Sequence, residues 1–196
     1  MLLRVRRPNE GRGALSRRAR THRTDSMRTV FLDTETTGLR GVYAGGTDEI
    51  VELAILDSCG NPIINQLVRP ARRKSWPDAQ RIHGISPVMV ADAPTLQVIL
   101  PEVCDAVDGC RVVIYNAAFD LQFFPKHVFR ESQVECAMLR FAEWKGDWNS
   151  FYGNHRWHKL QVAAKVTGFN EDVNWHRALA DTLACRHVWQ YLSRCA

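Results

Sequence analysis

Residues 29–39 (TVFLDTETTGL) place two carboxylates at the end of an apolar run. The β-branched and aromatic residues at 29–32 predict a buried strand, and side chains two apart on a strand point to the same face. Asp33 and Glu35 therefore share a face. Burying two like charges beside an apolar strand is unfavourable unless a partner compensates them. The pattern predicts either a divalent-metal site or, since Asp-x-Glu is common, an ordinary exposed strand end followed by a turn.

The charge of the chain is unevenly distributed. Residues 1–26 hold eight arginines against Glu10 and Asp25, a net charge of +6, so the remainder carries −1 of the total of +5. The pI of about 9.0 therefore reflects the amino-terminal segment and does not indicate a basic nucleic-acid surface on the rest of the chain. At 45% hydrophobic residues, the remainder suits one domain with its own core, and no apolar run approaches a membrane span.

We therefore expect a basic, disordered tail at 1–26 and a single domain at 27–196. A leader from an early start codon, an Arg-rich organelle presequence or a nucleic-acid-binding arm are alternatives for the tail. The six cysteines lie in apolar segments without Cys-x-x-Cys spacing, which predicts reduced core thiols and a cytoplasmic location. His155 and His158 have zinc-ligand spacing, but no cysteine pair lies near them.

The order of the predicted elements is that of an α/β domain. Three strands at 29–32, 50–56 and 63–68 predict an antiparallel meander, and further strands are expected at 111–115 and 134–138. Helical periodicity or helix stop signals predict six helices, at 78–83, 95–108, 117–128, 139–148, 159–167 and 178–192. The stretch 148–157 is rich in aromatic residues and is expected to be a loop that covers a core edge or, as the alternative, stacks on bases.

Two of the expected helices carry a carboxylate in their apolar stripe. Asp120 lies among Ala117, Leu121 and Phe124, so it is either a hydrogen-bonded structural residue or a metal ligand. Asp181 recurs in the same way in the last helix. His176 lies five residues earlier, roughly 140° around a helix, and is therefore placed in the preceding loop, either near the site or as a capping or exposed residue.

Two further polar features have a structural and a functional interpretation. His83 ends a short expected helix and is interpreted as a surface or packed histidine rather than a ligand. The loop from Arg69 to Pro77 holds Arg72, Arg73 and Lys74, a cluster that suits a solvated loop or contact with a phosphate backbone.

Together, three separated segments place carboxylates on apolar faces that converge over one sheet. Four carboxylates would repel one another, whereas two hard cations would make them a site. Oxygen ligands suit Mg²⁺ or Mn²⁺, and two such ions can activate water and stabilise the leaving oxygen of a phosphodiester.

The motif order resembles the DEDDh group of 3′–5′ exonucleases, which includes the proofreading epsilon subunit of bacterial DNA polymerase III and exonuclease X. The matching residues are Asp33-x-Glu35, Asn116 to Asp120, and His176-x4-Asp181, with residues 82–85 (IHGI) between the first two motifs. The resemblance covers residues 28–192. It implies an RNase H-like fold, a mixed five-stranded sheet flanked by helices, and stepwise release of nucleoside 5′-monophosphates.

By the same resemblance, the metals would be held by Asp33, Glu35, Asp120 and Asp181, with His176 as general base. The terminal nucleotide would be cradled by Thr34, Thr36, Thr37, Gly38, Leu39, His83, Asn116 and Phe119. The expected partner is the 3′ end of single-stranded nucleic acid, DNA favoured over RNA, with a homodimer or a polymerase as further partners and no membrane. An RNA-trimming exonuclease and a non-catalytic nucleic-acid- or polymerase-binding module are the alternatives.

Overall fold

The computed structural model describes residues 27–195. The expectations for the basic segment at 1–26 therefore lie outside the described residues. Within the described range, no helix combines the length and apolar character needed to cross a membrane.

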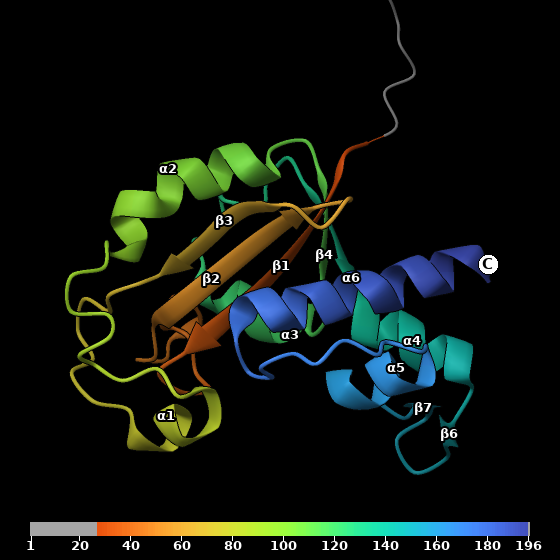
Figure 1. The fold of residues 1–196 in the computed structure, drawn as a ribbon. Coiled ribbons are helices and arrows are strands. Elements are labelled where there is room, and N and C mark those ends of the chain that lie inside the picture. Colours follow the sequence, from red (N-terminus) through yellow and green to blue (C-terminus); the bar gives the residue numbers. More distant parts are fainter. Residues whose placement is uncertain (1–26, 196) are drawn as a thin grey trace, which may run out of the picture.

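A mixed five-stranded sheet forms the centre of the molecule (Figure 1). Its strands in chain order are β1 (Thr29–Thr36), β2 (Ile50–Asp57), β3 (Pro62–Leu67), β4 (Arg111–Ile114) and β5 (Gln133–Cys136). The spatial order is β3-β2-β1-β4-β5. β1, β2 and β3 pair antiparallel as the predicted meander, whereas β4 pairs parallel to both β1 and β5. The predicted fold class is confirmed.

Helices cover both faces of this sheet (Figure 1). They are α1 (Pro77–His83), α2 (Leu96–Val107), α3 (Ala117–Asp120), α4 (Ala137–Lys145), α5 (Leu160–Val166) and α6 (Ala178–Arg194), with short 3₁₀ turns at η1 (Val42–Ala44) and η2 (Leu121–Phe123). Val30 and Leu32 of β1 pack in the core beneath α2, while Phe31 packs in a second core with α4, α5 and α6. Because side chains alternate along a strand, Asp33 and Glu35 lie on the α6 side with Phe31.

Three sequence-based expectations about elements and cysteines are wrong. The helix expected over 117–128 ends at Asp120 and continues only as η2, because Phe124 precedes Pro125 and is extended, as proline requires of the residue before it. The loop expected over 148–157 contains a two-stranded hairpin, β6 (Trp148–Asn149) and β7 (Asn154–His155). Cys59 and Cys195 are exposed rather than core thiols.

Candidate active site

The predicted site residues meet where β1 and β4 end. Parallel neighbouring strands end at one edge of a sheet, the usual place for a site in an α/β fold. β1 carries Asp33 and Glu35, the chain leaving β4 leads through Asn116 into α3, and the first turn of α6 brings in Asp181. One hollow is lined by Asp33, Thr34, Glu35, Tyr115, Asn116, Phe119, Asp120, Leu160, His176 and Asp181.

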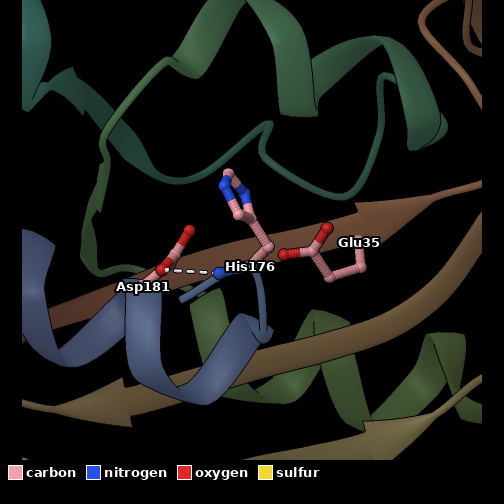
Figure 2. A group of neighbouring side chains, drawn as sticks. All are labelled: Glu35, His176 and Asp181. Carbon is pink, nitrogen blue, oxygen red and sulfur yellow. Dashed lines mark hydrogen bonds between the residues drawn. The ribbon is translucent and has the colours of Figure 1, made fainter. Parts of the chain in front are cut away.

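His176 lies in the loop before α6, between Glu35 and Asp181 (Figure 2). Its φ of 61° is in the left-handed region, which non-glycine residues seldom adopt. The backbone N–H of His176 donates to Asp181 Oδ1 at 3.3 Å. One potential ligand atom from each of Glu35, His176 and Asp181 lies within 4.8 Å of the others. This turn therefore places an imidazole and two carboxylates around one point.

The four carboxylates share a strongly unfavourable electrostatic environment. Burial, and then the charges of the neighbouring acids, raise the pKa of Asp33 well above its usual range and that of Glu35 to about 8. Burial also raises the pKa of Asp120 to about 7 and that of Asp181 to about 6, although His176 opposes the latter shift. Without a cation, this group holds protons at neutral pH.

A divalent cation fits this donor set. The four acids supply hard oxygen ligands, which suit Mg²⁺ or Mn²⁺, and a bound cation would replace the protons that the buried carboxylates otherwise hold. Asp33, Glu35, Asp120 and Asp181 are the residues that would hold it. We therefore treat this hollow as a candidate metal-dependent active site.

Asp120 is held by a neighbour on β1. Its side chain is only 3% exposed, and its Oδ1 accepts a hydrogen bond of 2.7 Å from Thr34 Oγ1. This bond lowers the pKa of Asp120 against the larger effect of burial. Asp120 is thus both hydrogen-bonded and part of the acidic cluster, so the two interpretations of its place in an apolar stripe are compatible.

Sequence reasoning missed an ion pair that fixes the His176 loop. Glu52 of β2 lies opposite Glu35, and its carboxylate accepts hydrogen bonds from Arg177 Nε at 3.0 Å and from the backbone N–H of Ala178 at 2.9 Å. Because Arg177 follows His176 directly, the pair ties the loop and the start of α6 to the sheet. The detectable signal was a single carboxylate, Glu52, within the apolar stretch 50–56.

A second hollow adjoins the acidic cluster and contains most of the predicted nucleotide-binding residues. It is lined by Thr34, Glu35, Thr36, Thr37, Gly38, Leu39, Asp48, Arg73, Asp78, Ala79, Ile82, His83 and Phe119. The remaining predicted residue, Asn116, lines the first hollow. The two hollows share Thr34, Glu35 and Phe119, so they are adjacent.

Internal hydrogen bonds shape the wall of this second hollow. The hydroxyls of Thr36 and Thr37 donate to Gly38 O and Asp48 Oδ1, respectively, which folds the turn after β1. Nδ1 of His83 accepts from the N–H of Ile85 at 3.0 Å, so its Nε2 carries the proton that faces the Thr36 carbonyl at 3.2 Å. Burial lowers the pKa of His83, which favours this neutral form. His83 is therefore a buried, hydrogen-bonded side chain in the wall of this hollow.

Comparison with known proteins identifies the class that this fold and site define. The exonuclease family model (RNase_T) matches residues 30–188, and the chain belongs to that family. It is a 3′–5′ exonuclease of the DEDDh type, with the RNase H-like fold. Such exonucleases are generally dependent on divalent metals.

Individual relatives agree with this class. The uncharacterized exonuclease CP81 of Escherichia phage 186 is 37% identical over 180 residues, covering 85% of this chain and 88% of that protein. The DNA polymerase III epsilon subunit of Escherichia coli is 32% identical over 107 residues, which cover 51% of this chain and 43% of the subunit. The structure of exonuclease X in complex with 5′ overhanging duplex DNA matches with a TM-score of 0.65 and 26% identity, covering 86% of this chain and 92% of that one.

Proposed function

We propose that this chain removes nucleoside 5′-monophosphates from the 3′ end of single-stranded DNA. The observation that carries the proposal is the convergence of Asp33, Glu35, Asp120, Asp181 and His176 on one hollow beside a second that suits a terminal nucleotide. Two of the matches favour DNA as the substrate, since a 33% identical Escherichia coli relative is named an exodeoxyribonuclease and exonuclease X was solved with duplex DNA bearing a 5′ overhang.

The residues of the hollow have separable tasks in this proposal. The four carboxylates would hold two Mg²⁺ or Mn²⁺ ions. Such ions, when bound, activate the attacking water and stabilise the leaving oxygen of the phosphodiester. His176 accepts the proton of that water as general base, and its loop position leaves the ring reachable from the hollow. The turn at Thr36–Leu39, with Thr34, His83, Asn116 and Phe119, orients the terminal nucleotide.

Digestion of a 5′-labelled DNA strand and its RNA equivalent, with Mg²⁺, Mn²⁺ or a chelator, tests this function. We expect a metal-dependent ladder that shortens from the 3′ end, faster on DNA, and abolished in Asp33→Ala. Asp105→Ala, an exposed acid on α2, is the matched control and should retain full activity. A faster RNA ladder would select the RNA-trimming alternative, and failure to cleave either strand would overturn the proposal.

The general-base role of His176 has its own test. We expect His176→Ala to lower kcat by roughly 10²- to 10⁴-fold, the usual contribution of a general base. His187→Ala is the control, because that histidine lies on α6 and its ring bonds the Thr167 carbonyl at 3.0 Å, outside the site. An unchanged kcat in His176→Ala would remove this histidine from the chemistry while leaving the exonuclease activity itself in place.

Association with a polymerase or a second copy of the chain also belongs to the proposal. It rests on the epsilon relatives, such as the Escherichia coli subunit, of whose length this chain spans 43%. Sedimentation of the purified protein alone measures self-association, and sedimentation with a replicative polymerase subunit measures binding to the polymerase. A single monomeric species in both experiments would describe a free enzyme.

A further inference from the structure

The β6–β7 hairpin projects from the body of the protein beside α4 and α5 (Figure 1). We propose that this hairpin and the loop that follows it form a stacking surface for the single-stranded segment upstream of the scissile phosphate. We call this surface, made by residues 148–159, the aromatic platform. The inference rests on the proposed exonuclease function and adds to it the path of the substrate strand.

Four aromatic side chains of the platform lie open to solvent. The exposed fractions are 60% for Trp148, 85% for Phe151, 72% for Tyr152 and 60% for Trp157. The expectation that these residues cover a core edge is therefore wrong. Exposing this much aromatic surface on one short segment is unfavourable in water and marks an interaction site.

The hairpin orders Trp148, Phe151 and Tyr152 relative to one another. Main-chain pairing joins Trp148 to His155 and Asn149 to Asn154. The side-chain oxygen of Asn149 accepts the N–H of Phe151 at 3.1 Å, and the Phe151 and Tyr152 rings meet edge to face with their centroids 4.8 Å apart. A prearranged aromatic surface loses little conformational entropy when it binds a flexible strand.

A chain of hollows joins the platform to the acidic cluster. A hollow of about 520 Å³ is lined by Tyr115, Asn116, Met138, Trp157, His158, Lys159, Leu160, Gln161, His176 and Asp181. It shares His176 and Asp181 with the site, and it shares His158 with a further hollow that contains Trp148 and Arg156. The predicted cradle for the terminal nucleotide lies on the Glu35 and Phe119 side of the cluster, so the remainder of a bound strand can leave over His176 toward Trp157.

The charges along this path suit a phosphate backbone. Arg156 and Lys159 are exposed, and neither forms an ion pair with any residue between 27 and 195. The acid beside the hairpin, Asp147, lies 3.3 Å from Lys145 Nζ and 3.2 Å from His158 Nε2. Cations interleaved with exposed aromatic rings are the pattern that binds single strands with little sequence preference. The occupant is therefore a single-stranded nucleic acid.

The test measures kcat/KM on oligothymidylates of two to about twelve nucleotides, a range that spans known single-strand site sizes. In the unmodified protein, kcat/KM should rise with length until the strand reaches the platform. The double variant Phe151→Ala/Tyr152→Ala should hydrolyse the dinucleotide with unchanged kcat/KM. On the longest strand, its kcat/KM should fall roughly 5- to 150-fold for each base that no longer stacks. Tyr43→Ala removes an exposed aromatic ring from a different hollow and should leave the length dependence unchanged.

The contributions of charge and of aromatic stacking to strand binding can be measured separately. Arg156→Gln/Lys159→Gln should flatten the dependence of log KM on log salt concentration for the long strand, by about 0.7 per lost phosphate contact. Trp157→Phe should retain the gain with length that Trp157→Ala loses, since phenylalanine preserves a stacking ring. All of these residues are exposed, and thermal unfolding of each variant verifies that the fold is intact.

The outcomes separate this inference from the proposed function. If the unmodified protein cleaves all lengths equally, or if the platform variants keep the full gain with length, the platform does not bind the strand. Loss of self-association in the variants, with unchanged kinetics, would instead assign the surface to a second copy of the chain. Failure of the unmodified protein to cleave any oligonucleotide would contradict the proposed function itself.

Discussion

The carboxylate of Asp120 depends on one neighbouring hydroxyl. Burial raises its pKa to about 7, and the hydrogen bond from Thr34 limits that rise. In Thr34→Val the shape is kept and the hydroxyl is lost, so the pKa should rise further and protons should compete better with metal. Because a hydrogen bond to a charged group contributes about 1.5–3 kcal/mol, we expect Mn²⁺ affinity to fall at least about tenfold at pH 7.

Calorimetric Mn²⁺ titrations without substrate measure this effect of Thr34→Val. The loss of affinity should shrink at pH 9, where a larger fraction of Asp120 is ionised in both proteins than at pH 7. Thr95→Val, at the start of α2, is the control because Thr95 forms no side-chain cap bond and lies outside the acidic hollow. Equal Mn²⁺ affinities at pH 7 would show that the Thr34 bond does not tune the site.

At the residue scale, the sequence predicts the candidate metal ligands and general base but not the residues that hold them in place. Alternation along β1 predicts that Asp33 and Glu35 share a face, and helical spacing predicts that Asp181 lies on the apolar face of its helix. Both predictions succeed because each pattern involves residues close together in the sequence. Glu52 bonds a residue 125 positions away, and no local pattern indicates that distance. Its position in an apolar strand signals only that it needs a partner.

At the scale of elements, the start of α6 is anchored to β2 by Glu52 and Arg177. Removing one partner of a buried ion pair costs roughly 3–5 kcal/mol. The Arg177 side chain is 32% exposed, so Arg177→Met should lower the free energy of unfolding by less, about 2 kcal/mol. Since the anchor also sets the His176 loop, kcat should fall while KM for a dinucleotide changes little.

Denaturant unfolding and dinucleotide kinetics measure both effects of Arg177→Met. Arg81→Met, which removes the exposed partner of Asp78 on α1, is the control and should leave both quantities unchanged. Glu52→Gln/Arg177→Met should recover part of the stability, because no buried charge is then left unpaired. A double variant no more stable than Arg177→Met would show that the ion pair does not act as a unit.

The prediction of secondary structure fails where no periodic sequence pattern determines the element. The five sheet strands follow from short runs rich in apolar and β-branched residues, and helices α2 and α6 follow from helical spacing of apolar residues. The helix at Ala117 was extended too far because its apolar stripe continues beyond Pro125, where the backbone cannot remain helical. The β6–β7 hairpin has two residues in each strand, too few for alternation to be visible.

At the scale of the whole molecule, the acidic cluster links folding to pH and metal. In the metal-free protein the pKa of Glu35 is raised from 4.5 to about 8, that of Asp120 from 3.8 to about 7 and that of Asp181 from 3.8 to about 6. The folded state therefore binds more protons than the unfolded chain across this range, so stability falls as pH rises. The contribution of these three groups is complete below about pH 4 and is lost progressively as pH rises through about 8.

Thermal unfolding in a chelator should accordingly show Tm falling between pH 5 and pH 8. Within this range, saturating Mn²⁺ should raise Tm most at pH 8, where the carboxylates hold the fewest protons. Glu35→Gln removes the group whose pKa reaches about 8, so in the chelator its Tm should be higher than that of the unmodified protein at pH 8 and should vary less with pH. The same variant should lose exonuclease activity, because a side chain suited to catalysis is here unfavourable for folding. A Tm that is constant over this range in the chelator, or unaffected by Mn²⁺ at pH 8, would contradict the linkage.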